Sequence, residues 1–208
     1  MNKNIILSTL FVLTSLLFIS VSQAATVQPT LSFNPSTSNV NINDVFSVDV
    51  VISGLENGGD EIVSAFDLDV GFDASILQAN SVTFGLSLGD PVFFEAFTDS
   101  DLSNPGFVNL AELSLLPDPV LQALQGDSIV LASIEFTALA GGASNLSFIS
   151  GLFGYDVKGL NAALLDINVE DGLVNVATPS TVVPVPAALP LMVSGLAFLG
   201  FQGRRRKQ

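Results

Sequence analysis

The sequence predicts an all-β domain of the β-sandwich class, flanked by an N-terminal signal peptide and a C-terminal hydrophobic helix. Three observations lead to this prediction. Apolar and polar residues alternate with a strict period of two along the middle of the chain, turn-forming segments separate these stretches, and little of the segment has helical spacing. Many short, half-buried strands with little helix are typical of two sheets packed face to face.

The first 24 residues have the three parts of a secretory signal peptide. Lys3 precedes an apolar stretch from Ile5 to Val21, and the small residues Ser22 and Ala24 follow it. We therefore expect cleavage after Ala24. The alternative interpretation is an uncleaved N-terminal anchor.

Residues 25–177 form the predicted domain, and four stretches within it alternate clearly. The residues expected to face the core are Phe46, Val48, Val50 and Ile52; Phe66, Leu68, Val70 and Phe72; Val130, Ala132, Ile134 and Phe136; and Leu165, Ile167 and Val169. Asp67 and Asp69 fall on the opposite, solvated face. Asp171-Gly172 suits a hairpin turn into a closing strand, and weaker strands are expected at 31–35, 81–85, 107–115 and 145–150.

One short helix is expected in the segment "PDPVLQALQGD". Asp118 is placed to cap it, Pro119 fits its first turn, and Gly126 fits just past its end. The segment Phe72–Leu77, "FDASIL", is expected to form a single turn with Asp73 as its cap.

The order of these pieces resembles a cohesin domain over roughly residues 30–177. The segments concerned read "VGFDASILQANSVTFG", "LASIEFTALAGGASNLSF" and "YDVKGLNAALLDINVEDGLVNV", and "FDASIL" matches best, with Phe72 where the family often has Tyr. The resemblance implies a nine-stranded jelly-roll β-sandwich that binds a dockerin-bearing protein. The fold is also similar to one class of carbohydrate-binding modules, so an extracellular polysaccharide is the other candidate ligand.

Charge and composition exclude several classes of function. All 20 acidic residues lie between Asp44 and Asp171, where Lys158 is the one basic residue, and such a domain repels nucleic acid. The chain has no Cys and no His, which excludes disulfides, thiol chemistry and Ser-His-Asp catalysis. We therefore expect a noncatalytic protein, and a carboxylate-based glycan hydrolase is the last-ranked alternative.

Two short segments hold candidate contact residues. In "DPVFFEAF", Phe93, Phe94 and Phe97 cannot all face inward from one strand, so they are candidates for an apolar contact patch; the alternative is packing under a loop. In "TDSDLSN", Asp99, Asp101 and Ser103 alternate as calcium ligands do in an oxygen-rich loop. Asn104 and Leu110 replace the Gly and Glu of an EF-type loop, so a solvated acidic turn is the alternative, and no cofactor other than calcium is considered.

The chain ends in a linker, residues 178–182, and a tail, residues 183–208. The tail contains a proline motif, a predicted transmembrane helix at 187–203 and a basic end. The proline motif consists of Val183, Pro184, Val185, Pro186 and Ala187, and the basic end of Arg204, Arg205, Arg206 and Lys207. Counted back to Val182, the apolar stretch is long enough to span a bilayer, and the basic cluster stays cytoplasmic.

This tail resembles the VPLPA variant of the PEP-CTERM sorting signal, with Val185 in place of Leu. The resemblance implies recognition by an exosortase-type membrane protease, removal of the tail, and delivery to the cell surface or the extracellular polysaccharide matrix. The alternative is a permanent single-pass membrane anchor. The expected role is thus a secreted or surface binding protein, and the main alternative is a passive matrix component without a specific ligand.

Overall fold

The computed structural model describes residues 28–35, 37–55, 61–150 and 155–178. The predicted signal peptide, the linker from residue 179 onward and the sorting tail lie outside the described residues. Cleavage after Ala24, the roles of Val183–Ala187 and Arg204–Lys207, and the helix at 187–203 therefore stay predictions. Within the described ranges no helix is long and apolar enough to cross a membrane.

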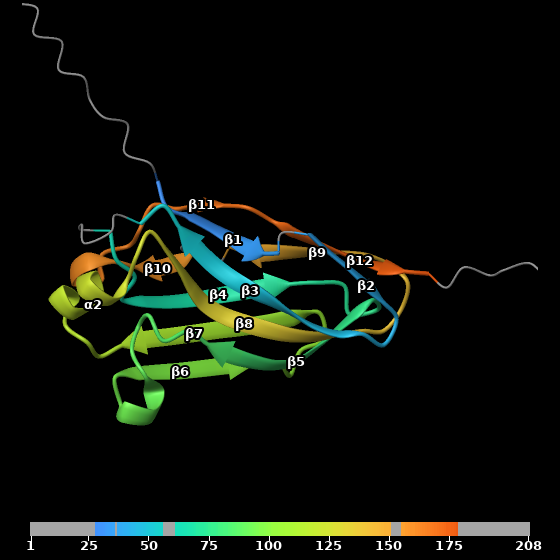
Figure 1. Cartoon of the computed structure of the whole chain (residues 1–208), viewed down its shortest axis with the longest axis horizontal. Coiled ribbons are helices and arrows are strands. Elements are labelled where there is room, and N and C mark those ends of the chain that lie inside the picture. The colour runs from blue at the N-terminus through green and yellow to red at the C-terminus, as the bar shows by residue number, and fades with distance from the viewer. Residues whose placement is uncertain (1–27, 36, 56–60, 151–154, 179–208) are drawn as a thin grey trace, which may run out of the picture.

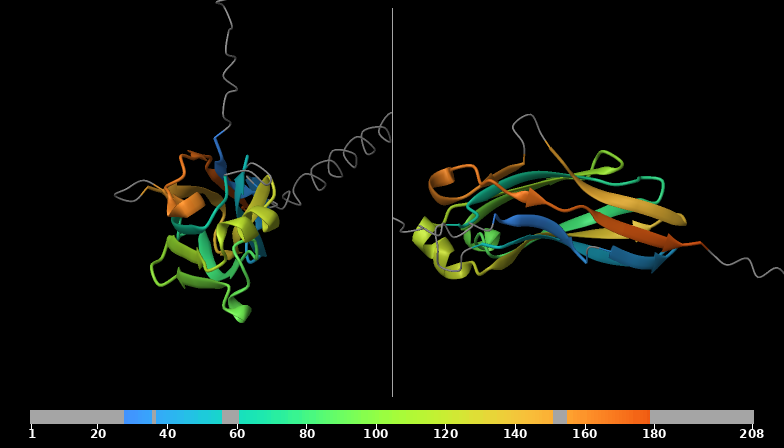
Figure 2. Two further views of the ribbon diagram at one scale, coloured as in Figure 1. Left: turned by 90° about the vertical axis from the view of Figure 1, so that its left-hand side faces the viewer. Right: turned by 90° about the horizontal axis from the view of Figure 1, so that it is seen from above.

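Two sheets packed face to face make up the domain, which confirms the predicted β-sandwich (Figures 1 and 2). The first sheet has the order β11 (Asn168–Val169), β1 (Thr30–Asn34), β3 (Val45–Ser53), β8 (Ser128–Ala138) and β5 (Leu77–Phe84). The second sheet has the order β2 (Thr37–Asn41), β12 (Gly172–Ala177), β9 (Gly142–Ile149), β4 (Ala65–Gly71), β7 (Phe107–Ser114) and β6 (Ala96–Asp101). The short strand β10 (Asp156–Lys158) pairs with the first residues of β4.

The described residues form twelve strands, where the resemblance implied nine. The N-terminal strand divides into β1 and β2, which join different sheets, and β10 and β11 are two further short segments. Each of the weaker strand candidates is confirmed, since they lie in β1, β5, β7 and β9. The sandwich is elongated, with α2 (Asp118–Leu124) and the 3-10 turn η2 (Leu160–Ala162) at one end (Figure 1).

Alternating apolar side chains from both sheets fill the space between them. Val48, Val50 and Ile52 of β3 and Ala132, Ile134 and Phe136 of β8 are fully buried, as the alternation predicted. The rings of Phe33 and Phe148 stack across the sheets with their centroids 4.2 Å apart. Burial of each large apolar side chain stabilises the fold by roughly 1.5–3 kcal/mol, so this interior is the main support of the sandwich.

One predicted core position is wrong. Val130 is exposed, and its neighbours Ile129 and Leu131 are buried. The register between β3 and β8 shifts at this point, because Val50 pairs with Ala132 whereas Val51 pairs with Val130. The extra residue, Leu131, forms a β-bulge, and a bulge reverses the inward and outward phase of the strand.

The hairpin predicted at Asp171-Gly172 is also wrong. β11 pairs in parallel with β1 in the first sheet, whereas β12 pairs with β2 and β9 in the second sheet. The chain crosses between the layers at the predicted turn. Gly172 fits there because a Cβ atom would lie 3.1 Å from the side chain of Phe33.

The predicted helix is confirmed as α2, but its cap is wrong. Asp118 is the first helical residue rather than the cap, which is Pro117. The Asp118 carboxylate instead accepts a hydrogen bond from the backbone N–H of Asn161 in η2, at 3.0 Å. The predicted turn at "FDASIL" is confirmed, with the Asp73 carboxylate accepting from the N–H of Ser75 at 2.8 Å and from its hydroxyl at 2.6 Å.

Candidate functional site

The outward side of the second sheet is the candidate site. β10, β4, β7 and β6 lie side by side there, and opposite residues of antiparallel strands point to the same side. The inward positions of β4 and β7 are buried between the sheets, so the intervening residues face solvent. We call this surface the acidic face, for the residues described next.

Three rows of side chains cross the acidic face in register. The first row is Asp156, Asp67, Ala111 and Asp99, with one residue from each of β10, β4, β7 and β6. The second row, in the same strand order, is Lys158, Ala65, Leu113 and Phe97. The third row runs from β9 to β6 and consists of Ile149, Asp69, Asn109 and Asp101. Five carboxylates thus share one surface with a single cation and three exposed apolar side chains, Ile149, Leu113 and Phe97.

A shallow groove of about 250 Å³ lies over the first two rows, and we call it the Ala111 groove. Ala65 and Ala111 carry only methyl groups, whereas Phe97 and Leu113 rise on one side of them. Asp67, Asp99, Asp156 and Lys158 also line the groove. The depression follows from the sequence, because two alanines are surrounded by longer side chains.

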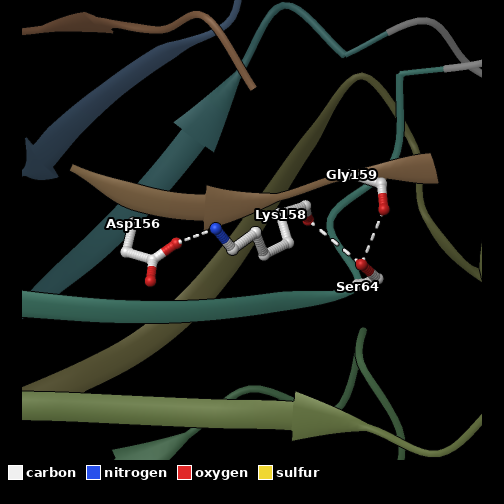
Figure 3. A network of polar contacts seen from close by, with 4 residues as sticks. All are labelled: Ser64, Asp156, Lys158 and Gly159. Carbon is white, nitrogen blue, oxygen red and sulfur yellow. Dashed lines mark hydrogen bonds and ion pairs between the residues drawn. The ribbon is translucent and has the colours of Figure 1, made fainter. Parts of the chain in front are cut away.

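Lys158 is the only basic residue in the part of the chain that the structure describes. Its ammonium forms an ion pair with the carboxylate of Asp156 at 2.6 Å (Figure 3). The Ser64 hydroxyl donates to the carbonyl oxygens of Lys158 and Gly159, at 3.3 and 2.7 Å, and fixes the end of β10 against β4. Asp156 therefore already has a cationic partner, and the other carboxylates of the face have no cation near them in the described residues.

Asn109 and Ser103 orient three of the other carboxylates. The side-chain amide of Asn109 donates to Asp67 and to Asp69, each at 2.8 Å, and so bridges the two carboxylates. Hydrogen bonds from the hydroxyl and the backbone N–H of Ser103 lower the pKa of Asp101. Asp101 therefore keeps its negative charge to a lower pH than an ordinary aspartate.

The predicted calcium ligands do not lie on a loop. Asp99 and Asp101 belong to β6, and Ser103 follows the strand and donates its N–H to Asp101 at 2.8 Å. Among the described residues no group of three or more acidic side chains is placed to hold a metal ion. The loop on which the prediction depended is thus a strand, and calcium binding stays a prediction.

Glu112 is a buried acid that the sequence pattern did not draw to our attention. It is 2% exposed and faces inward with Val108 and Leu110, and neither carboxyl oxygen has a hydrogen-bond partner. Burial raises the pKa of Glu112 to about 8, so the side chain is mostly neutral at pH 7. The sequence did hold one signal, because in "FVNLAELS" this acid occupies a position where the alternation predicts an inward-facing apolar residue.

The three candidate phenylalanines are all exposed, which is inconsistent with the alternative of packing under a loop, and their contact role stays a prediction. Phe97 is 60% exposed on the acidic face, opposite Leu113. Phe93 and Phe94, 73% and 79% exposed, lie on the 3-10 turn η1 (Pro91–Phe93) and the residue after it. Asp90 caps this turn by accepting from the N–H of Val92 at 2.8 Å, and Phe94 has the unusual φ of 60°.

A second cavity, of about 310 Å³, opens between the start of β5 and the loop at residues 102–107. Its lining includes Phe72, Gln78, Leu102, Asn104 and Phe107. None of the side chains around it is an acid or a base, so this cavity offers no group for proton transfer.

The family model for the cohesin domain matches residues 31–176. The sixth cohesin of scaffoldin B from Acetivibrio cellulolyticus, solved in complex with a Cel5 dockerin, is 19% identical; the match covers 73% of this chain and all of that one, with a TM-score of 0.57. A cohesin of Clostridium acetobutylicum is 20% identical over 74% of this chain and 94% of its own, with a TM-score of 0.57. A cohesin module from a family 33 glycoside hydrolase of Clostridium perfringens is 19% identical over 72% and 95%, with a TM-score of 0.52. No curated protein matches the chain in sequence.

Proposed function

The chain belongs to the cohesin domain family, and from this premise we propose that it is a noncatalytic module that binds a dockerin-bearing protein on its acidic face. The observation that carries the proposal is the pattern of three rows in register across β10, β4, β7 and β6. A partner that covers this face would contact apolar and charged groups on one surface. Protein–protein interfaces commonly combine a few apolar side chains that bind strongly with polar groups around them.

The solved relatives support the choice of partner. The cohesin of Acetivibrio cellulolyticus and one from Clostridium thermocellum were each solved in a complex with a dockerin. Their sequence identities to this chain, 19% and 10%, support a common fold, and the partner is part of our proposal.

A noncatalytic role is supported by the chemistry of the surface. Three carboxylates of the acidic face, Asp67, Asp99 and Asp156, line an open groove, whereas the acid Glu112 is a buried residue of β7. A hydrolase needs two carboxyl groups placed on either side of a bound glycosidic bond. The alternating pattern of these residues instead matches what an exposed sheet face presents to a partner.

The protein is proposed to work outside the cell. Its signal peptide would be cleaved after Ala24, and an exosortase-type protease would act on the tail that contains Val183–Ala187 and Arg204–Lys207. Intact-mass analysis of the protein from its native host tests this step. Copies that mostly retain Arg206 would contradict removal of the tail and leave the permanent anchor as the explanation.

Affinity capture tests the binding function. The tagged protein, as its native host secretes it, is incubated with the host's extracellular fraction, and retained proteins are identified by mass spectrometry. We expect enrichment of a protein that carries a dockerin, followed by saturable binding of that purified protein in calorimetry, with and without calcium. Absence of every dockerin-bearing protein from the retained fraction would contradict the proposal.

Polysaccharide binding is a second candidate function, and the exposure of Phe93 and Phe94 favours it. Exposed rings stack on the apolar faces of sugars, and a rigid turn presents these two. The double variant Phe93→Ser/Phe94→Ser should abolish retention on the host's exopolysaccharide if this candidate is correct. Retention that persists in the folded variant would exclude this turn, and absence of any ligand would leave the passive matrix role.

A further inference from the structure

We propose that the Ala111 groove receives the side chain of an arginine from the partner protein, with its guanidinium between Asp67 and Asp99. This inference rests on the proposed function, because it specifies the chemistry of the partner at the same face. The register of three strands, the distribution of charge and the apolar wall of the groove support it.

The register leaves a gap of the right size. Ala111 on β7 lies directly between Asp67 on β4 and Asp99 on β6. Neighbouring strands are about 4.8 Å apart, so the backbones that carry the two carboxylates are separated by about 10 Å. The methyl group of Ala111 fills little of this space, and a planar group inserted above it reaches both carboxylates.

The groove contains carboxylates that no cation of the described residues neutralises, so a cation of the partner protein can pair with them. Lys158 is matched by Asp156 at 2.6 Å, so it leaves Asp67 and Asp99 without a cationic partner. Asp67 accepts one hydrogen bond, from Asn109, and retains further acceptor positions. Asp99 is exposed and accepts no hydrogen bond within the described part of the chain.

The apolar wall distinguishes arginine from other cations. Phe97 and Leu113, 60% and 50% exposed, stand opposite each other beside the two alanines. A long side chain lays its methylene stem on such a wall while its charged end reaches the carboxylates. The planar guanidinium also stacks on an aromatic ring and binds carboxylates in a bidentate manner, whereas the ammonium of lysine is more strongly hydrated.

A titration followed by NMR tests the inference with defined probes. The ¹⁵N-labelled full-length protein in zwitterionic detergent micelles is titrated with N-acetyl-arginine amide, with the lysine analogue, and with the neutral isostere N-acetyl-citrulline amide. We expect saturable shifts of the amides of Ala65, Phe97 and Ala111, with a dissociation constant on the order of 10 mM for arginine. Lysine should bind at least about fivefold more weakly, and citrulline should cause no saturable shift.

Two double variants distinguish the effect of the groove on arginine binding from the effect of the overall charge. Asp67→Asn/Asp99→Asn removes two charges from the groove, and Asp49→Asn/Glu135→Gln removes two from the outward side of the first sheet. The groove variant should lose arginine binding, whereas the control should stay within about twofold of the wild type. Equal weakening in both variants, or shifts located on β3 and β8, would overturn the inference.

The same variants distinguish this inference from the proposed function. If the dockerin-bearing partner binds the wild type and the groove variant equally, the arginine site is wrong and the proposed function stands. If arginine binds the groove but no dockerin-bearing protein is captured, the groove chemistry stands and the proposed partner is wrong.

Discussion

The two outward sides of the sandwich differ sharply in chemistry, although the same alternation of residues produces both. The outward side of the first sheet carries hydroxyl groups, such as those of Ser47, Ser133 and Thr137, and the exposed Val45 and Val130, with Asp49 and Glu135 as acids on β3 and β8. The acidic face of the second sheet carries five carboxylates, one ion-paired lysine, Phe97 and Leu113. Burial explains only the inward residues of the two sheets, so the difference between their outward residues indicates function.

The largest effect should come from filling the groove. Ala111→Arg places a cation between Asp67 and Asp99, where it blocks the partner without loss of stability, because it pairs with both carboxylates. The control, Ser133→Arg, places the same side chain beside Asp49 on the other sheet. We expect calorimetry to show at least a hundredfold loss of affinity for the dockerin-bearing protein in the first variant. Less than a twofold change in affinity is expected in the control. Equal losses of affinity in the two variants would contradict the assignment of partner binding to the acidic face.

A second prediction concerns Glu112, which directly follows Ala111 and faces inward. Its pKa is raised to about 8 in the folded state from the ordinary value of 4.5. Its contribution to stability is therefore fully present below about pH 4.5 and is lost as the pH rises through 8. Glu112→Gln should remove this dependence, so that the free energy of unfolding, relative to wild type, rises by about 3–4 kcal/mol between pH 5 and pH 8.

Denaturant titrations at several pH values measure this difference. Glu135→Gln, which neutralises an acid on the outward side of β8, serves as the control and should leave the pH dependence nearly unchanged. A Glu112→Gln variant whose stability follows that of the wild type at every pH would show that the buried carboxyl is ionised or solvated.

A smaller effect is expected at the apolar wall of the groove. Phe97→Ser removes an exposed ring, so it should leave the folding stability nearly unchanged and weaken partner binding by about tenfold. Val51→Ser, on the outward side of the first sheet, is the matched control and should leave binding unchanged. Calorimetry on both variants decides whether Phe97 anchors the partner.

The smallest effect should appear in the turn η1, which precedes the acidic face. Phe94 has a φ of 60°, which glycine adopts without the steric cost that an L side chain incurs. Phe94→Gly should therefore raise the free energy of unfolding by about 0.5 kcal/mol. Phe93→Gly, at a position without positive φ, should lower it. A lower stability in both variants, measured by thermal unfolding, would mean that the Phe94 ring packs usefully on the domain.

The inward half of the fold was predictable from the sequence because burial imposes a period of two. The buried residues of β3 and β4 follow that period, and Phe66, Leu68 and Val70 were identified in advance. The bulge at Leu131 and the crossing at Asp171-Gly172 were not predictable, because each depends on which strand lies alongside. Local turn chemistry at Asp171-Gly172 is compatible with a hairpin, and pairing of β11 with β1 overrode it.

The candidate site was predictable only as separate parts. Phe97 and Asp99 were singled out, and Asp67 and Asp69 were recognised as outward-facing acids, but a solvated sheet face shows the same pattern. Their significance depends on register between strands that are far apart in the chain, above all the pairing of Asp156 with Asp67. Glu112 was missed because an acid in the apolar phase of one short strand has no local signature.

The most direct test is to map where the dockerin-bearing partner binds, by following the amide shifts of the ¹⁵N-labelled protein as the purified partner is added. We expect the largest shifts on the strands that carry the acidic face, Ala65–Gly71, Ala96–Asp101 and Phe107–Ser114. Shifts concentrated on Val45–Ser53 and Ser128–Ala138, with the acidic face unchanged, would contradict it.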